Sequence, residues 1–391
     1  MKNLLILFVV LSAVFGFEAA TIGTAAVGLM TFSVPFLNAG SLNMAIPVQD
    51  AQGLFTKKLV AVYKEMPVVK SFLRSLFRTN VSMTKEVSVA VQRGSETVAV
   101  DVFRYSDGNR NSFDKSTERI IVPPFYHEWM SVSEHRLYDQ VITALANGDV
   151  TFFAQMTQEM AEQLVALQNK IDRAIELQCA QVMETGIVTL ASGENIDFKR
   201  KAASIVAYNA ANDFSISTVD PRKVLEAGCV FIRQKGKSQG QYMNAILGGT
   251  ALTDLLNNPK IQGSSDLRDI QLGTLSIGMQ TATGAVPVGE LSCGSFKVRL
   301  WSYPEYYDLN GTSTPYINDK KVAMFPDNPN FVMAYAAVPQ LIKNGSIPQK
   351  GEYLVQEFLD EKRASHEVHI KSAVVAVPVA IDQLYTVTVK N

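Results

Sequence analysis

The sequence predicts an α+β protein organised around one long helix, and three observations support this fold class. From Asp149 to Thr185 the chain has no proline or glycine, and its apolar residues recur every three or four positions, which is the α-helical period. Residues 84–122 carry alternating valines, and residues 365–391 are almost entirely strand-like. Residues 221–364 mix helix-like and strand-like segments in a further unit.

The long helix is predicted over residues 147–185, with Asp149 or Thr151 capping its start and Gly186 following its end. At the helical rise it is roughly 50 Å long, longer than most helices of globular proteins. Its apolar positions form one stripe: Phe153, Met156, Met160, Leu164, Leu167, Ile171, Ile175, Cys179 and Val182. One stripe without sustained heptads favours a spine packed under a sheet. A strand, a turn and a second strand are predicted at 187–200.

Residues 84–122 predict a long two-stranded excursion with little apolar surface to bury. Asp107 and Gly108 are a strong hairpin signal, and the chain returns through residues 116–124. The alternating valines are Val87, Val89, Val91, Val98, Val100 and Val102. A two-stranded sheet is marginally stable in water unless something covers it. We therefore expect another chain or domain to contact this segment.

Three further segments have definite patterns. Residues 54–78 are predicted to form short helices split by Pro67. Their apolar face carries Val68, Phe72, Leu73 and Leu76, and their polar face Lys70, Arg74 and Arg78. Residues 315–336 predict a hairpin that turns at Pro-Asp-Asn-Pro, and Pro378 indicates an edge strand or a bulge near the C-terminus.

Composition excludes several classes of protein. Lysine and arginine number 36 against 37 aspartate and glutamate residues, and the net charge of −1 argues against a protein that coats nucleic acid with basic side chains. An apolar content of 47% excludes wholesale disorder. Cys179, Cys229 and Cys293 are scattered and odd in number, so we predict apolar core thiols in a reducing cytoplasm, without disulfides or a zinc knuckle.

Residues 1–53 form an uncharged hydrophobic N-terminal extension apart from Lys2, Glu18 and Asp50. A basic start, a short apolar run and small residues after it are typical of a secretory signal peptide. The run is too short for a typical membrane span. Two interpretations stay open: the protein is exported, or the region is an upstream extension of a chain that starts at Met30 or Met44.

No segment predicts a catalytic or cofactor-binding site. The Gly-Lys-Ser triplet at 236–238 lacks the first glycine of a phosphate-binding loop. His366 and His369 lie three apart in a predicted strand and so face opposite sides, which does not suit two metal ligands. No cysteine or acidic trio joins His127 and His135 at ligand spacing. We predict a protein that is not an enzyme and has no cofactor or metal site.

The order of parts is more informative than any motif. An amphipathic N-terminal arm, a protruding β-excursion, a long helix, a strand pair, an α/β unit and terminal strands follow one another over about residues 54–391. The most characteristic stretches are FLRSLFRTNVSMTKEVSVAV, IIVPPFYHEWMS, ETGIVTLASGENIDF, MFPDNPNFVMA and AVVAVPVAIDQLYTVTV. In this order and in these stretches the chain resembles the lambda-type major capsid proteins of tailed bacteriophages, the phage major capsid protein E family.

The resemblance implies a Hong Kong 97-type capsid fold and a division of the chain into segments. The expected segments are the N-terminal extension at 1–53, an N-arm at 54–83, an extended loop at 84–122, a peripheral domain with the spine helix at 123–217, an axial domain at 218–364, and C-terminal strands at 365–391 that return to the peripheral domain. Lambda-type relatives begin shortly before FLRSLF, so residues 1–43 are expected to be a mis-set start or an upstream extension.

The resemblance also implies a function. The chain would be a major capsid protein whose copies form pentamers and hexamers and close into an icosahedral head shell around phage or prophage double-stranded DNA. Expected partners are other copies of the chain, with scaffold, decoration and portal proteins as further candidates. DNA would be enclosed without sequence-specific binding, which fits the near-neutral charge. Assembly is expected in the host cytoplasm, the final location is the virion, and no membrane is expected for the mature protein.

The extended loop and its return strand are expected to contact other subunits. Pro123 and Pro124 would enforce an extended bend where the loop meets the body. The candidate contact residues are Val98, Val100, Val102, Tyr105, Phe113, Phe125, Tyr126 and Trp129. Two alternatives stay open: an encapsulin-like nanocompartment shell that packages protein cargo, and an exported envelope or surface-binding protein, which only the N-terminal residues suggest.

Overall fold

The computed structural model describes residues 42–49, 55–62, 69–92, 116–133, 152–190, 193, 195–265, 273–275, 279–309, 311–342, 345–360 and 365–391. The chain falls into two units, Met1–Met66 and Pro67–Asn391. In the first unit β1 (Leu42–Gln49) and β2 (Phe55–Val62) form an antiparallel pair. The predicted helix over residues 55–62 is therefore wrong, because pairing with β1 outweighs the local apolar spacing.

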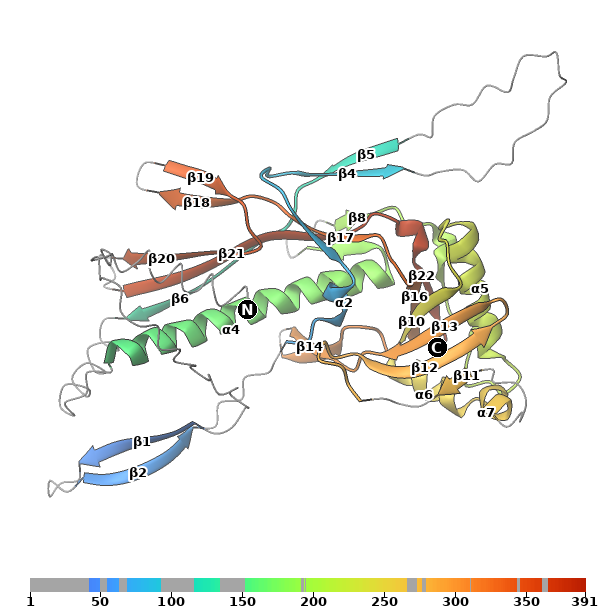
Figure 1. The fold of residues 1–391 in the computed structure, drawn as a ribbon, viewed down its shortest axis with the longest axis horizontal. Helices are drawn as coiled ribbons and strands as arrows, with labels where there is room; N and C mark the ends of the chain where they lie inside the picture. Colours follow the sequence, from blue (N-terminus) through green and yellow to red (C-terminus); the bar gives the residue numbers. More distant parts are fainter. Residues whose placement is uncertain are drawn as a thin grey trace, which may run out of the picture. The chain divides into compact units, whose positions relative to one another are not determined.

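The second unit contains a seven-stranded mixed sheet. In it β10 (Tyr242–Leu247) runs parallel to β13 (Phe296–Ser302) and antiparallel to β16 (Lys321–Pro326). The complete order is β11 (Gly273–Leu275), β12 (Val286–Cys293), β13, β10, β16, β22 (Tyr385–Thr388) and β9 (Ile205–Val206). Three helices lie beside this sheet in Figure 1, namely α5 (Pro221–Gln234), α6 (Gly249–Asn257) and α7 (Pro259–Ser265).

Helix α5 opens the segment 221–364, for which the sequence predicts a mixture of helices and strands. Asp220 caps it, since its Oδ1 accepts from the backbone N–H of Arg222 at 3.1 Å, and Pro221 occupies the first turn, where a missing N–H costs nothing. The helix covers one sheet face, and the core between them includes Leu225, Cys229, Ile232, Met243, Ala245, Val298, Leu300, Met324 and Val387.

The second sheet is built around the long strand β21 (Ser365–Pro378). Its order is β20 (Leu354–Asp360), β21, β17 (Phe331–Tyr335) and β3 (Arg78–Val81), and β6 (Phe125–Ser133) also pairs with β21. Residues 365–373 of β21 pair with β6, and residues 374–378 pair with β17. One strand therefore joins two parts of the sheet.

The predicted spine helix is confirmed as α4 (Phe152–Glu184), which packs along β21 and β6 (Figure 1). The described part of the predicted stripe is buried at Leu167, Ile171, Ile175, Cys179 and Val182, and Leu164 is half-buried. The side chains of Phe153, Met156 and Met160 lie outside the described residues. After α4 the predicted strand pair is also confirmed, as β7 (Ile187–Thr189) and β8 (Asn195–Asp197).

The predicted hairpin over residues 315–336 is wrong. Its two arms, β16 and β17, belong to different sheets, so the Pro-Asp-Asn-Pro segment connects the sheets instead of closing a hairpin. β16 pairs with β10 and β22, whereas β17 pairs with β21 and β3. Local turn chemistry indicates where a chain bends but not which strand it meets next.

The two sheets also divide the chain differently from the predicted segment boundaries. β17 and β20 fall within the expected axial segment 218–364 but lie in the sheet of β21. The C-terminal strands 365–391 separate: β21 ends at Pro378, and β22 enters the seven-stranded sheet beside β16. Pro378, which has no N–H to donate, therefore marks the end of a strand at the crossing between sheets.

Two-stranded sheets extend the second unit. β4 (Val87–Gln92) pairs with β5 (Ser116–Ile121) at the root of the predicted excursion, and β18 (Val338–Ile342) pairs with β19 (Gly345–Gln349). A third pair consists of β14 (Tyr306–Leu309) and β15 (Thr312–Pro315). Among the described strands, none of these pairs joins either large sheet (Figure 1).

Candidate subunit-contact surface

One face of the β6–β21–β20 sheet carries a row of rings. In the antiparallel register Phe125 lies opposite Ala373, and Trp129 lies opposite His369, and directly opposed residues share a face. Phe125 and Trp129 are 50% and 48% exposed as residues. We call this the aromatic sheet face; it comprises Phe125, His127, Trp129, Phe358 and His369. Two predicted contact residues therefore lie on a surface that another chain can reach.

Tyr126, the third predicted contact residue on β6, points to the opposite face, toward α4. Its hydroxyl accepts a hydrogen bond from Nε2 of Gln178, and it is half-buried. Glu128, two residues on, binds Nζ of Lys170 on the same helix at 2.6 Å. The side chain of Tyr126 thus serves contacts within the chain, and strand alternation explains why its neighbours on β6 face away.

The root of the β4–β5 pair alternates in the same way. Ile121 is 5% exposed and belongs to the core of the second unit, whereas Ile120 and Val122 are 64% and 52% exposed. Pro123 is buried, and the carbonyl of Pro124 accepts from the backbone N–H of Val374, which ties the return strand to β21. The remaining predicted contact residues, Val98, Val100, Val102, Tyr105 and Phe113, lie outside the described residues.

A buried carboxylate anchors the N-terminal segment of the second unit to the spine helix. The short helix α2 (Phe72–Ser75) has no side-chain cap of its own. Glu176 of α4 accepts from the backbone N–H groups of Leu73 at 2.8 Å and Arg74 at 3.0 Å, so it satisfies donors that a helix start leaves free. The hydroxyl of Tyr303, which follows β13, donates to the same carboxylate at 2.8 Å. The helix α2 and the segment after β13 therefore converge on one buried side chain of α4.

Arg74 completes this anchor. Its guanidinium donates to Asp172 of α4 at 2.7 Å and to Glu352, which precedes β20, at 3.0 Å. It also donates to the hydroxyls of Tyr335 and Tyr353. The sequence predicts Arg74 on the polar face of its helix, opposite Phe72 and Leu73. In the structure this polar face is half-buried, because acidic and phenolic partners from distant segments meet the charge there.

Burial raises the pKa of Glu176 to about 7, against the opposing effect of its three hydrogen-bond donors. The native state therefore holds this proton more tightly than the unfolded chain, whose glutamate titrates near 4.5. The contribution of Glu176 to stability is present below about pH 4.5 and is lost as pH rises toward 7. Relative to Glu176→Gln, we expect the free energy of unfolding of the unassembled chain to fall by up to about 3 kcal/mol between pH 5 and pH 8.

Urea unfolding of both chains at the two pH values measures this difference. Glu290→Gln, at a half-exposed carboxylate on β12, serves as the control and should keep the wild-type pH dependence. An identical pH dependence in the wild type and in Glu176→Gln would contradict the assignment of this titration to Glu176.

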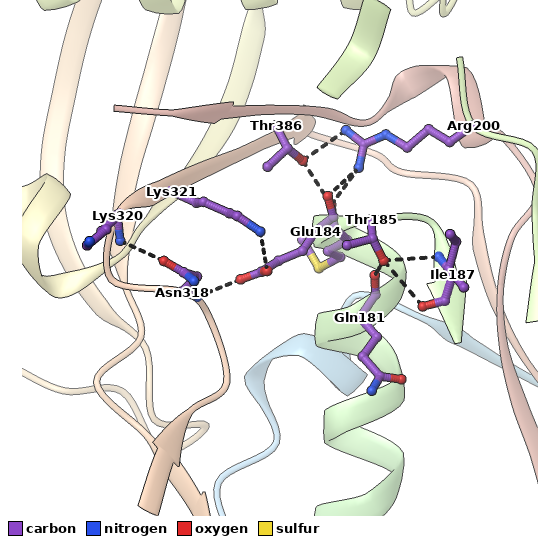
Figure 2. A network of polar contacts seen from close by, with 10 residues as sticks. Gln181, Glu184, Thr185, Ile187, Arg200, Asn318, Lys320, Lys321 and Thr386 are labelled. Atoms are coloured by element: carbon purple, nitrogen blue, oxygen red, sulfur yellow. Dashed lines mark hydrogen bonds and ion pairs between the residues drawn. The ribbon is translucent and has the colours of Figure 1, made fainter. Parts of the chain in front are cut away.

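The other end of α4 has its own joint, shown in Figure 2. Arg200 donates to the last helical carbonyls, those of Met183 at 2.9 Å and Glu184 at 3.1 Å, and to Oγ1 of Thr386 on β22. Burial lowers the pKa of Arg200 to about 10. The predicted helix stop is confirmed, because Gly186 adopts a left-handed φ of 75° just after the helix.

Glu184 extends this joint to the seven-stranded sheet. Its carboxylate accepts from Nζ of Lys321 on β16 at 3.0 Å and from the backbone N–H of Asn318 (Figure 2). Together with Thr386 on β22, these contacts fix the C-terminal end of α4 to two strands of the seven-stranded sheet. The spine helix is therefore attached to both large sheets of the second unit.

The described residues contain few groups suited to catalysis. The three cysteines are buried and unpaired by disulfides, and burial raises the pKa of Cys229 and Cys293 to about 12, so neither thiol is readily ionised. Within the described ranges, histidine, cysteine and acidic side chains nowhere gather in threes around a possible metal position. No helix among them is both long and apolar enough to cross a membrane.

Comparison with known proteins identifies the fold. A crystal structure described as a prophage capsid protein of Escherichia coli CFT073 is 16% identical, with a TM-score of 0.53 over 82% of this chain and 93% of that one. The capsid of a native GTA particle is 12% identical (TM-score 0.48, 90% and 100% covered). An encapsulin of Synechococcus elongatus PCC 7942 is 10% identical (TM-score 0.44, 85% and 93% covered). No curated protein matched.

The predicted α+β, Hong Kong 97-type capsid fold is confirmed by the structural neighbours. The family model described as phage major capsid protein E matches residues 55–389, which is most of the chain. Family membership makes the protein a structural component of a phage head, located in the virion, and not an enzyme, as the sequence predicted. With its N-terminal anchor, spine helix and two sheets in this order, the chain belongs to the phage major capsid protein E family.

Proposed function

We propose that copies of this chain assemble into pentamers and hexamers, which close into an icosahedral shell around double-stranded DNA. The β4–β5 pair is the observation that carries the proposal. Its described strands pair only with each other, and its root exposes Ile120 and Val122. A two-stranded sheet of this kind is marginal in water and needs a cover. In a closed shell, a neighbouring copy supplies that cover for every subunit.

The aromatic sheet face supports the same proposal. Phe125 and Trp129 are large rings, each about half exposed, on a rigid sheet that α4 backs from the other side. Aromatic side chains are enriched in protein interfaces because they bury much area with few rotatable bonds. We infer that this face and the excursion contact other copies, and that scaffold, decoration and portal proteins meet the shell formed in this way.

A matched pair of substitutions tests the assembly role. Ile120→Asp changes an exposed residue, so we expect a soluble subunit whose stability stays within about 0.5 kcal/mol of the wild type. Electron microscopy should nevertheless show no closed shells, because the charge would be buried between copies. Ile121→Asp places the same charge in the core and should abolish soluble, folded protein. Normal shells from Ile120→Asp would contradict the proposed contact.

The wild-type chain, expressed from Met1 and separately from Met44, tests the function as a whole. Closed shells, capsomer rings or tubes support a capsid protein, and a monodisperse monomer from both starts contradicts it. The contents of particles purified from source cells distinguish the two kinds of shell. Nuclease-protected double-stranded DNA supports a phage head, whereas a protein cargo without DNA supports the encapsulin-like alternative.

A further inference from the structure

We propose that His127 and His369 on the aromatic sheet face form a two-histidine chelate for a late divalent transition-metal ion such as Ni²⁺ or Zn²⁺. The two residues come from neighbouring strands, β6 and β21, which run side by side in Figure 1. They are 242 positions apart in sequence. The proposal concerns the single subunit and does not depend on the proposed assembly.

The separation of the two nitrogens fits one shared ion. Nε2 of His127 and Nδ1 of His369 lie 2.9 Å apart. Two imidazole nitrogens that bind one metal ion each lie about 2.0–2.1 Å from it. Their separation is then roughly 2.9–3.4 Å, as the N–metal–N angle goes from that of square-planar to that of tetrahedral coordination. The ring centroids are 5.1 Å apart, so the two nitrogens point at each other, and a shared ion would lie beside the line that joins them. The ring of the exposed His127 would turn to direct Nε2 at the ion, while both strands keep their places. Imidazole is a preferred ligand of nickel, copper and zinc.

Glu367 orients the inner histidine for this role. Its Oε2 lies 3.1 Å from Nε2 of His369, so the carboxylate accepts the N–H at that nitrogen and leaves the lone pair at Nδ1 free to face His127. Metal-binding histidines characteristically donate their remote N–H to a carboxylate. Without metal, His127 donates from Nε2 to His369. With metal, the proton of neutral His127 moves to its Nδ1, and no proton is released.

Packing holds His369 in place and leaves His127 accessible. The ring of Trp129 stacks on His369 at a centroid distance of 5.8 Å and an angle of 12°, and Phe358 of β20 meets the same ring edge-on at 4.9 Å. The His369 side chain is only 13% exposed, whereas His127 is an exposed residue. An ion can thus enter beside His127, and solvent completes its coordination.

The charged groups around the pair are Glu367 and Lys371 on the same face of the sheet and Glu128 on the other face of β6. Lys371 lies opposite His127 on β21, but its ammonium donates to Oε1 of Gln356 on β20 and sits over the Phe358 ring. Imidazole binds a metal ion only in its neutral form, so metal binding should weaken under acid conditions.

Calorimetric titration of the full-length, unassembled chain with NiCl₂ and with ZnCl₂ tests the proposal. We expect one ion per chain at about pH 7.5 and markedly weaker binding at about pH 5.5, where protons compete. His127→Gln and His369→Gln should each weaken binding by more than about tenfold, and Glu367→Gln by about tenfold. Unchanged melting temperatures in metal-free buffer would show that these variants remain folded.

His366→Gln is the matched control, since it removes a histidine of the same strand and keeps the pair. It should bind like the wild type. The proposal would be overturned if His366→Gln lost as much metal affinity as the variants of the pair. It would also be overturned if His127→Gln and His369→Gln both still bound one ion per chain with wild-type affinity. If a glutamine variant does not fold, NMR spectroscopy of the histidine ring nitrogens in the wild-type chain provides the test. A metal-induced shift of the resonances of Nε2 of His127 and Nδ1 of His369 supports the chelate. The absence of a shift at both nitrogens contradicts it.

Discussion

Arg74→Ala is expected to lower the free energy of unfolding of the subunit by about 3 kcal/mol or more, because it leaves Asp172 without its cationic partner in a mostly buried position. The substitution also removes the donors to Glu352, Tyr335 and Tyr353. Urea unfolding of the unassembled chain measures the change. The loss is large because one guanidinium joins α2 to α4, to β17 and to the segment before β20.

Two variants show whether the geometry of this anchor matters or only its charge. Arg74→Lys keeps the charge but not the planar fork, so we expect it to recover only part of the lost stability. Arg78→Ala removes an exposed arginine four residues further on and should change stability by only about 0.5 kcal/mol. Equal stability of Arg74→Ala and Arg78→Ala would mean that Arg74 is not part of a stabilising anchor.

Deletion of residues 96–112 is expected to abolish shell closure while the subunit stays folded. These residues lie outside the described ranges, but the strands that lead to them, β4 and β5, pair only with each other among the described strands. The core contacts of Ile121 lie beyond the deletion, so thermal melting of the unassembled subunit should be unchanged. Electron microscopy of the assembled products measures closure.

A variant that carries a flexible segment of equal length in place of residues 96–112 tests whether shell closure depends on the length of the excursion or on its side chains. We expect no closed shells from this variant either, because the proposed contacts of Val98, Val100 and Val102 would be missing. Closure restored by the flexible segment would remove these residues from the contact surface. Normal shells from the deletion itself would show that the excursion is not needed between subunits.

The spine helix shows how much local pattern can predict. A stripe spaced by three or four residues, no proline, and a glycine at the end are properties of one continuous segment, and α4 follows them closely. The start of α5 also depends on neighbouring residues alone, since Asp220 caps the helix and Pro221 occupies its first turn. These local patterns predict the folded structure well because the backbone hydrogen bonds of a helix form within the helix itself.

The candidate surface was only partly predictable. The aromatic residues of β6 stood out in the sequence, but strand pairing decided that Phe125 and Trp129 share the exposed face and that Tyr126 faces α4. No sequence signal paired His127 with His369 or placed Glu176 beneath α2, because each contact joins segments more than a hundred positions apart.

The sequence by itself determined the element types over most of the second unit, the buried stripe of α4 and the family to which the chain belongs. Only the tertiary structure decided that β2 is a strand, that β16 and β17 enter different sheets, and that the half-buried Arg74 joins acidic and phenolic partners. The physical reason is the range of the interactions. Helix periodicity and caps act within a few residues, whereas strand partners and buried charge pairs depend on segments that meet only when the whole chain has folded.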